Sequence, residues 1–305
     1  MKATFYSNGK LLITGEYVVL DGAKALAIPT KFGQYLTVEP VLESWSLEWI
    51  SYNSDGTIWF EETLPFSTLI HKERFPESHT IKNTLVEIMH EAYLLNPTFI
   101  TKSNGFKVTT QLTFPKNWGL GTSSTLINNI AQWANVDPFL LLKNSFGGSG
   151  YDIACAKNNT PILYQLLNNI PYIEQVNFNP IFSEQLYFLY LNQKQSSKTA
   201  ITHYLNKQVK VGQNISAINQ LTSQIVQTQN VTDFALLLEK HEVLLSKILE
   251  VQTVKEAYFS DFKGIVKSLG AWGGDFVLVV SKENPKAYFE SKGFSTLLPF
   301  ADMVL

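Results

Sequence analysis

The chain has 305 residues, of which 45% are hydrophobic and 16% are charged, and its formal net charge is −2. This length predicts about two domains with a substantial buried core. Nucleic acid and anionic membranes attract basic surfaces, so this charge balance argues against both as the main partner. Small molecules remain as the expected ligands.

Cysteine content and apolar runs indicate the compartment. The single cysteine, Cys155, excludes an internal disulfide framework and fits a reducing environment. No apolar run reaches the roughly 20 residues of a membrane span, and the N-terminal apolar stretch is interrupted by Gly15 and Glu16, unlike a signal peptide. We therefore expect a cytoplasmic protein without membrane partners. The aromatic content leaves room for an apolar interface and a homodimer, but the sequence indicates no oligomeric state.

The N-terminal segment predicts two short strands joined by a turn. Residues Thr4–Tyr6 and Leu11–Thr14 have strand composition, and Ser7–Lys10 has turn composition. Lys10 would then lie at the tip of a hairpin, where a lysine is more often simply solvated than functional.

The next hundred residues predict strands followed by a helix. Residues 32–60 are strand-like, with a hairpin turn at Asn53–Gly56. Residues 80–95 carry apolar side chains at helical spacing, with Ser78 or Thr80 as the capping residue.

A strand, a glycine turn and a helix start follow one another between residues 106 and 133. Residues Phe106–Phe114 alternate polar and apolar, which favours a strand. Gly119 and Gly121 permit a sharp turn, and three helix-capping types follow them, namely Thr122, Ser123 and Ser124. Such a junction aims backbone N–H groups and the helix dipole at one spot, which favours phosphate binding.

Two better-known phosphate loops do not fit this segment. A Walker A loop ends in Gly-Lys-Ser/Thr, and this loop has no lysine. A Rossmann fingerprint has a third glycine where Ser124 stands here and lies near the first strand of its domain. Taken alone, the string is as often a capped helix start without a ligand.

Three glycines stand just before a carboxylate in the next segment. Asp137-Pro138 predicts the start of a short helix, and Gly147, Gly148 and Gly150 precede Asp152. Asp152 is therefore either held in a pocket by unusual backbone or is an ordinary turn or N-cap carboxylate.

The pattern changes near residue 180, where we place a domain boundary between residues 1–180 and 181–305. A strand at Gln185–Leu191 is followed by helical spacing at Thr199–Leu205, Ile215–Val226 and Asp233–Leu249. His241 lies on the apolar face of the last of these helices, so we expect a packed core histidine.

Two further polar segments lie in this second half. Residues 192–199 join a strand to a helix with three hydroxyls and two lysines, which suits either a second anion site or a solvated cap. Residues Lys267–Asp275 form another glycine-rich loop before the strand Phe276–Val280. No spacing of Cys, His and carboxylate side chains is typical of a structural metal site.

In this order, the segments resemble the GHMP small-molecule kinases. Residues Gly9–Leu20 are similar to the family's opening Gly-Lys, hydrophobic strand and Gly-Glu-Tyr/His; Gly119–Ser124 is similar to its Gly-Leu-Gly-Ser-Ser phosphate loop; and Gly270–Asp275 is similar to its third motif. Three details lean toward phosphomevalonate kinases: Gly15-Glu16-Tyr17, the run Gly148–Ala154, and Gly273-Gly274-Asp275.

The resemblance implies an α+β fold of two domains. The N-terminal domain, 1–180, would resemble the second domain of ribosomal protein S5 and carry the ATP phosphate loop and the catalytic aspartate. The C-terminal domain, 181–305, would be ferredoxin-like.

The resemblance also implies roles for individual residues. Asp152 would accept or orient the proton of the acceptor hydroxyl, and Lys10 would stabilise the transferring charge. ATP phosphates would lie on Gly119, Leu120, Gly121, Thr122, Ser123 and Ser124, and the Ser123 hydroxyl would reach Mg²⁺. The implied acceptor contacts are Glu16, Tyr17, Gly150, Lys194, Ser196, Ser197, Lys198, Gly273 and Gly274.

The chain departs from the family at two places. Leu141 occupies the place of the glutamate that helps hold Mg²⁺ in mevalonate kinases, and Trp272 stands where the family normally has glycine. The leading hypothesis is an ATP-dependent kinase for a small acidic metabolite of the mevalonate (isoprenoid) pathway, phosphomevalonate or mevalonate. The alternatives are a GHMP kinase for another alcohol, such as homoserine or a sugar, and a catalytically silent metabolite- or nucleotide-binding homologue.

Overall fold

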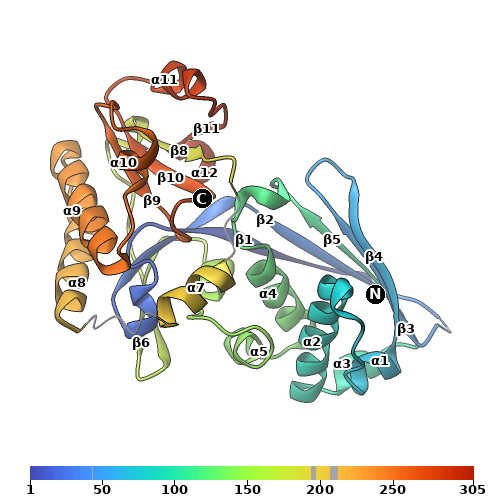
Figure 1. The fold of residues 1–305 in the computed structure, drawn as a ribbon. Helices are drawn as coiled ribbons and strands as arrows, with labels where there is room; N and C mark the ends of the chain where they lie inside the picture. The colour runs from blue at the N-terminus through green and yellow to red at the C-terminus, as the bar shows by residue number, and fades with distance from the viewer. Residues whose placement is uncertain (43, 194–196, 207–211) are drawn as a thin grey trace. The chain divides into compact units, whose positions relative to one another are not determined.

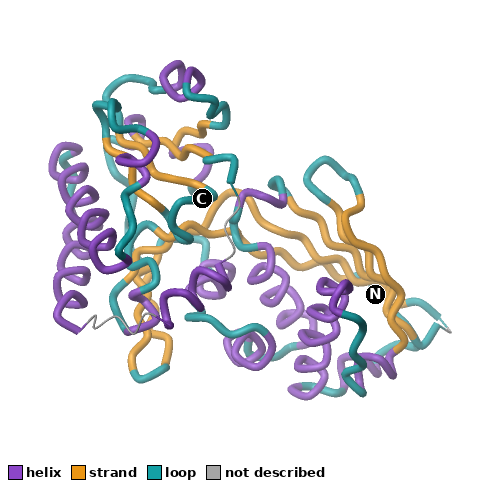
Figure 2. The backbone as a smooth tube through the Cα atoms, in the orientation of Figure 1, coloured by secondary structure: helices purple, strands orange, loops and turns teal. Residues whose placement is uncertain are grey.

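A computed structural model describes residues 1–42, 44–193, 197–206 and 212–305 (Figure 1). The chain contains both strands and helices, coloured orange and purple in Figure 2, so the mixed α+β prediction is confirmed. The chain divides into two compact units: unit 1 comprises Met1–Gly9, Phe32–Lys116 and Leu120–Lys157, and unit 2 comprises Lys10–Lys31, Asn117–Gly119 and Asn158–Leu305. The boundary near residue 180 stays a prediction.

Two long strands run through both units. β1 (Ala3–Leu12) pairs with β2 (Ala25–Pro40). The predicted turn at Ser7–Lys10 is therefore wrong, since these residues continue β1. Ser7 and Asn8 are buried, and the Ser7 hydroxyl donates to Asn129 Oδ1 at 2.7 Å. A buried hydrogen bond thus satisfies a side chain that in isolation would favour a turn.

Unit 1 is a sheet covered by helices. The second half of β2 pairs antiparallel with β5 (Phe106–Leu112), β5 pairs parallel with β3 (Ser46–Tyr52), and β3 forms the predicted hairpin with β4 (Ile58–Pro65). The helices of this unit are α1 (Phe66–Ile70), α2 (Thr80–Leu95), α3 (Thr98–Thr101), α4 (Thr122–Ala134), α5 (Pro138–Ser145) and α6 (Tyr151–Lys157). One apolar core joins them, with members such as Val38, Trp49, Met89, Val108 and Ile130.

The helix starts test the predicted caps. Asp137 accepts from the backbone N–H of Leu140 at 2.8 Å, which confirms the start of α5. The predicted caps of α2 and α4 are wrong, because their N-cap positions hold His79 and Gly121, without a side-chain cap. The 3₁₀ turn at Glu77–His79 leads directly into α2, so Ser78 cannot act as its cap.

Unit 2 contains the first half of β2, which pairs with β6 (Ile162–Leu167), and β7 (Ile170–Gln175), which pairs with β6. It also contains an antiparallel sheet in the order β11-β8-β10-β9, built from Leu297–Pro299, Leu186–Tyr190, Phe276–Val280 and Ile265–Ser268. Its helices are α7 (Ser197–Asn206), α8 (Gly212–Gln227), α9 (Val231–Leu249), α10 (Val254–Tyr258), α11 (Lys286–Ser291) and α12 (Phe300–Met303). No described helix is both long and apolar enough to cross a membrane.

Candidate functional site

The glycine loop opens α4 without a side-chain cap. Gly119 and Gly121 have φ angles of 67° and 93°, in the left-handed region that glycine tolerates best. Gly121 occupies the N-cap position, and the Ser124 hydroxyl donates to the Gly121 carbonyl at 2.9 Å instead of accepting from a helix N–H. Ser123 is exposed. Because no described side chain caps this end, the first N–H groups of a 13-residue helix are left to an external acceptor.

A neutral hydrogen-bond network holds α4 in unit 1. The Thr125 hydroxyl donates to Gln34 Oε1 at 2.7 Å, and Asn129 Nδ2 donates to the Gln34 carbonyl at 2.9 Å. Asn128 Nδ2 donates to the Ser7 hydroxyl at 2.8 Å, and that hydroxyl donates onward to Asn129. These buried bonds fix the helix on β1 and β2, which positions the loop that opens it.

Asp152 lies half-buried in the first turn of α6, which packs against α4 within unit 1. Gly147, Gly148 and Gly150 before it have φ angles of 76°, 105° and 90°. The unusual backbone predicted before this carboxylate is thus confirmed. The catalytic role of Asp152 stays a prediction.

Lys10 lies near the end of β1, in unit 2. Its side chain is buried, with 9% of the residue exposed, and Nζ donates to the Gly119 carbonyl at 3.2 Å. The interpretation of Lys10 as a solvated hairpin tip is therefore wrong. The structure instead places Lys10, from the Gly9–Leu20 motif, against Gly119, the first glycine of the Gly119–Ser124 motif.

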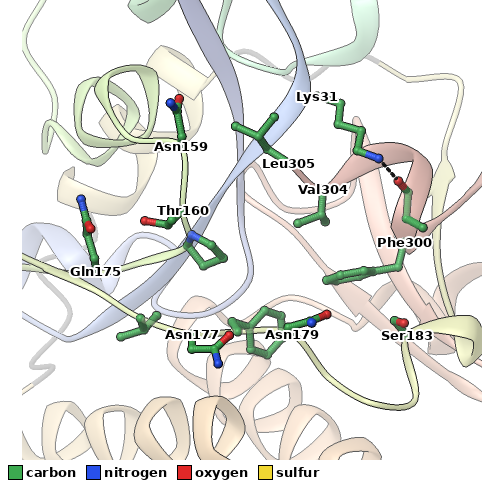
Figure 3. A pocket seen from close by; sticks show the side chains of 14 residues that line it. Lys31, Asn159, Thr160, Gln175, Asn177, Asn179, Ser183, Phe300, Val304 and Leu305 are labelled. Carbon is green, nitrogen blue, oxygen red and sulfur yellow. Dashed lines mark hydrogen bonds between the residues drawn. The ribbon is translucent and has the colours of Figure 1, made fainter.

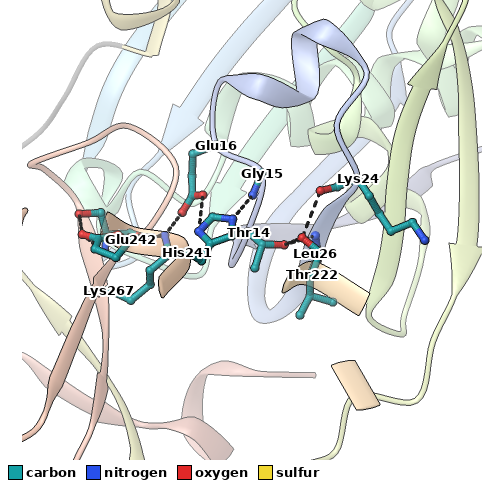
Figure 4. A network of polar contacts seen from close by, with 10 residues as sticks. Thr14, Gly15, Glu16, Lys24, Leu26, Thr222, His241, Glu242 and Lys267 are labelled. Atoms are coloured by element: carbon teal, nitrogen blue, oxygen red, sulfur yellow. Dashed lines mark hydrogen bonds and ion pairs between the residues drawn. The ribbon is translucent and has the colours of Figure 1, made fainter. Parts of the chain in front are cut away.

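Glu16 belongs to a fully buried cluster in unit 2, shown in Figure 4. Lys267 Nζ donates to Glu16 Oε1 and forms an ion pair with Glu242 Oε2 at 3.2 Å. His241 Nδ1 lies 4.0 Å from Glu16 Oε2, and His241 Nε2 accepts from the Gly15 N–H at 3.1 Å. We call Glu16, His241, Glu242 and Lys267 the buried charge cluster.

Burial and mutual charge set the protonation of this cluster. Desolvation raises the pKa of Glu16 to about 7, because burial outweighs the attraction of Lys267. For Lys267 burial opposes the charge, but Glu16 and Glu242 outweigh it and raise its pKa. Burial, and then Lys267, lower the pKa of His241 well below 6.5, so the ring is neutral. Since Nε2 accepts a hydrogen bond, its proton is on Nδ1, facing Glu16. The expectation of a core histidine is confirmed.

Tyr17 contacts the C-terminal glycine loop within unit 2. Its φ angle is 61°, and its hydroxyl accepts from the Trp272 backbone N–H at 2.9 Å. The indole N–H of Trp272 donates to the Gln252 carbonyl at 2.9 Å, and the ring packs on the apolar cluster of Tyr204, Ile218 and Leu245. Burial raises the pKa of Tyr17, so the hydroxyl stays protonated at neutral pH. Gly273 has a φ angle of 79°, and the Gly274 N–H donates to the Ala271 carbonyl at 3.3 Å.

The predicted site residues fall into three groups. Unit 1 holds residues 120–124, Gly150 and Asp152; unit 2 holds Lys10, Glu16, Tyr17, Gly119, Gly273 and Gly274. Lys194 and Ser196 lie outside the described residues. Ser197 and Lys198 begin α7, and their side chains lie outside what the structure describes. The roles of all these residues stay predictions.

Sequence reasoning missed Lys267 and Glu242 as members of the buried charge cluster. Lys267 is 251 positions away from Glu16 in the chain, and Glu242 follows a histidine on an otherwise apolar helix face. A lysine directly before a glycine loop and a glutamate beside the buried His241 were the available signals. Neither indicates a partner, because an ion pair at long sequence separation leaves no local pattern.

Unit 2 also has a pocket of about 740 Å³, shown in Figure 3. Amide side chains gather in it, with Lys31 donating to the Ala301 carbonyl at 2.6 Å. Its labelled lining includes Asn159, Thr160, Gln175, Asn177, Asn179 and Ser183. None of the predicted site residues lines it.

Comparison with known proteins identifies the fold. A scan against protein-family models gave no match, and a search of curated proteins gave none. Among solved structures, the chain is similar to Methanococcus jannaschii mevalonate kinase, with 15% identity, a TM-score of 0.66, and coverage of 96% of this chain and 95% of that one. It is similar to Streptococcus pneumoniae phosphomevalonate kinase in complex with phosphomevalonate and AMPPNP, with 18% identity, a TM-score of 0.67, and coverage of 97% and 99%.

A third similar structure is Lactococcus lactis galactokinase complexed with galactose, with 12% identity, a TM-score of 0.64, and coverage of 95% of this chain and 88% of that one. At these identities the likeness establishes the fold. The chain therefore has the fold of the GHMP kinases over nearly its whole length, which confirms the predicted fold class.

Proposed function

We propose that this chain is an ATP-dependent kinase that phosphorylates a small acidic metabolite, phosphomevalonate or mevalonate. The observation that carries the proposal is the start of α4. There two left-handed glycines and an exposed serine stand at a helix end that no described side chain caps. Such an end supplies N–H donors and a positive dipole to a phosphate. The similar fold of kinases, one of them in complex with AMPPNP, supports ATP as the ligand.

In this proposal the loop residues 119–124 bind the nucleotide phosphates. Lys10, buried and bonded to Gly119, contributes positive charge to the transferring group. Asp152 accepts or orients the proton of the acceptor hydroxyl. Gly150, Gly273, Gly274, Ser197 and Lys198, together with Lys194 and Ser196, remain the proposed acceptor contacts.

Mg²⁺ fits the donor set at the loop only in part. No described group of three or more His, Cys, Asp or Glu side chains could hold a metal ion, and Leu141, in place of the family's glutamate, is fully buried. The exposed Ser123 hydroxyl is an oxygen ligand of the kind Mg²⁺ accepts alongside phosphates and water. When bound, the ion would neutralise phosphate charge. Ser123 would be its protein ligand.

For Glu16 and Tyr17 we propose indirect roles in place of the acceptor contacts first expected. The Glu16 carboxyl is 0% exposed and bonded to Lys267, and the Tyr17 hydroxyl bonds Trp272. These contacts support roles in holding the C-terminal glycine loop.

A kinase for another alcohol is the second candidate, because the similar structures include a galactokinase complexed with galactose. The identity of the acceptor, the pathway, a cytoplasmic location and a homodimer stay predictions.

ADP release with Mg-ATP tests the proposal, with mevalonate, 5-phosphomevalonate, homoserine and galactose compared side by side. One acceptor should support turnover, and Asp152→Asn should lower kcat by about 10²–10⁴-fold while nucleotide binding persists. The matched control is Asp302→Asn, at an exposed position, which should leave kcat unchanged. Near-normal turnover in Asp152→Asn would contradict the catalytic assignment, and silence with all four acceptors would contradict the proposed substrate class.

A further inference from the structure

The first residues of the phosphate loop are docked on the C-terminal sheet of unit 2. The Tyr190 hydroxyl, from β8, donates to the Asn117 carbonyl at 3.1 Å. The Trp118 ring packs edge-on against Phe276, the first residue of β10, with their ring centroids 5.3 Å apart. The Phe276 ring also packs on Tyr190, with a centroid distance of 5.4 Å. These contacts assign Asn117–Gly119 to unit 2 although the rest of the loop belongs to unit 1.

At the end of this docked segment a carboxylate packs against a glycine. A Cβ atom placed on Gly119 would lie 2.1 Å from Asp275 Oδ2 and 2.2 Å from its Cγ. No side-chain carbon fits that space, so the carboxylate lies directly against the Gly119 backbone. The left-handed φ of 67° at Gly119 is a second reason for glycine at this position, because a residue with a side chain would be strained there.

The backbone of Asp275 is itself held on both sides. Its N–H donates to the Gln193 carbonyl at 2.7 Å, and its carbonyl accepts from the Leu191 N–H at 2.8 Å. Its φ of 52° is unusual for a residue with a side chain. A strained position fixed by two hydrogen bonds aims the carboxylate at one place and supports a function for that side chain.

Lys10 contacts the same glycine. Its Nζ donates to the Gly119 carbonyl at 3.2 Å, so an ammonium and a carboxylate both lie against one residue. If Gly119 shifted, an acceptor of the Lys10 ammonium would shift with it. The position of Lys10 therefore depends on what holds Gly119.

We propose that Asp275 is a positioning residue for the phosphate loop, whose carboxylate fixes Gly119 and through it Lys10. The inference rests on the proposed kinase function and adds a residue to it. Asp275 touches neither nucleotide nor acceptor in this account. It acts by holding the first glycine of the loop, and through that glycine the lysine, in place.

Turnover tests this role directly. Asp275→Ala should lower kcat by about 100-fold, the usual consequence of misplacing a reacting group by roughly 1 Å, with little change in the KM of the acceptor. Asp275→Asn has the same shape, packs on Gly119 in the same way, and should keep most of the activity. A merely structural role would lower kcat only in proportion to the folded fraction, which the thermal midpoint of each variant measures.

A double-mutant cycle tests the contact independently of turnover. Gly119→Ala adds both the overlap with Asp275 and the left-handed strain, whereas Gly119→Ala combined with Asp275→Gly removes the overlap. The pair should therefore be coupled, with the double variant more stable than the two single changes predict by addition. Gly56→Ala is the matched control, because its φ is 83° and nothing lies within 4 Å of its Cβ, so it measures the strain alone.

The outcomes separate the two proposals. Active wild type with an equally active Asp275→Ala would overturn the role of Asp275 and leave the kinase function intact. Additive stabilities in the cycle would overturn the contact itself. Inactive wild type with every acceptor would contradict the proposed function, whatever the cycle shows. Active wild type, an impaired Asp275→Ala, an active Asp275→Asn and a coupled cycle would together support Asp275 as a positioning residue.

Discussion

Two buried polar networks hold the elements that carry the candidate site, and they are built differently. In unit 1, the neutral side chains of Ser7, Asn128 and Asn129 bond one another, and Asn129 also donates to the Gln34 backbone carbonyl, at distances of 2.7–2.9 Å. In unit 2, the buried charge cluster places two carboxylates around one ammonium, and Glu16 Oε2 and His241 Nδ1 have no hydrogen-bond partner among the described residues.

The two kinds of network lose different amounts of stability when one member is removed. A neutral network that loses one member leaves a buried donor or acceptor unsatisfied, at a cost of about 1–3 kcal/mol. A charged cluster that loses its only cation leaves uncompensated buried charge, which costs about 3–5 kcal/mol. The buried charge cluster therefore depends more heavily on a single residue, Lys267.

The largest expected effect follows from removing that cation. Lys267→Met should lower the free energy of unfolding by about 3–5 kcal/mol, since Glu16 and Glu242 lose their shared partner. Urea unfolding measures it. Lys286→Met is the matched control, because Lys286 is 62% exposed in a pair with Glu290 and should change stability by less than about 0.5 kcal/mol. Equal effects of the two substitutions would contradict the ionic role of the cluster.

The raised pKa of Glu16 predicts a pH dependence. The folded pKa is about 7 and the ordinary value is 4.5, so between these values the folded state binds more protons than the unfolded one. The stability contributed by protonated Glu16 is therefore lost as pH rises through this window. His241 has the opposite effect. Because its pKa is lowered, its contribution to the stability of the protein is lost as the pH falls below 6.5.

Glu16→Gln isolates the Glu16 contribution. The substitution removes the titration and keeps the shape, while His241 still titrates in both proteins. The stability of wild type relative to this variant should be higher at pH 5 than at pH 8, by an amount on the order of a few kcal/mol. Urea unfolding at both pH values measures it. A difference that does not change with pH would show that Glu16 is ionised throughout.

The neutral network should respond less. Asn129→Ala should cost about 1–3 kcal/mol, because the Gln34 carbonyl loses a donor and the Ser7 hydroxyl loses its acceptor inside unit 1. Asn177→Ala, at an exposed position of the pocket in unit 2, is the control for the residue type and should be close to neutral. A cost for Asn129→Ala as large as that of Lys267→Met would remove the distinction between the two networks.

The smallest expected loss of stability is at a neutral contact in unit 2, and it tests whether charge or position in that unit makes a buried contact costly to lose. Thr222, also in unit 2, donates to the Thr14 hydroxyl at 2.9 Å in a neutral, buried contact (Figure 4). Thr222→Val should therefore cost only about 0.5–1.5 kcal/mol, measured by the same unfolding experiment. A much larger loss would mean that unit 2 is fragile throughout, and not only at its charges.

Much of the fold could be predicted because it follows local rules. The apolar spacing of residues 80–95 produced the helix α2 with the same bounds, and Asp137-Pro138 gave the start of α5. The error at Ser7–Lys10 came from the same rules, since turn composition ignores a hydrogen bond to Asn129, 122 positions away.

The candidate site was likewise predictable where it is local in sequence and not where it depends on distant residues. The glycine loop and the helix after it could be predicted from a contiguous string. The contact of Lys10 with Gly119 spans 109 positions and that of Glu16 with Lys267 spans 251, and no local pattern records either. The uncapped start of α4 was also missed, because three capping residues follow Gly121 but the Ser124 hydroxyl turns back to its carbonyl.

Equilibrium binding of Mg-ATP tests the central claim, that the loop before α4 binds nucleotide phosphates. Calorimetric titration should show binding to wild type, and Ser123→Glu should abolish it, because a carboxylate at an exposed loop position repels phosphate. Ser54→Glu, at the exposed hairpin turn, should bind as wild type does. Undiminished binding in Ser123→Glu, or no binding by wild type at millimolar nucleotide, would contradict the account.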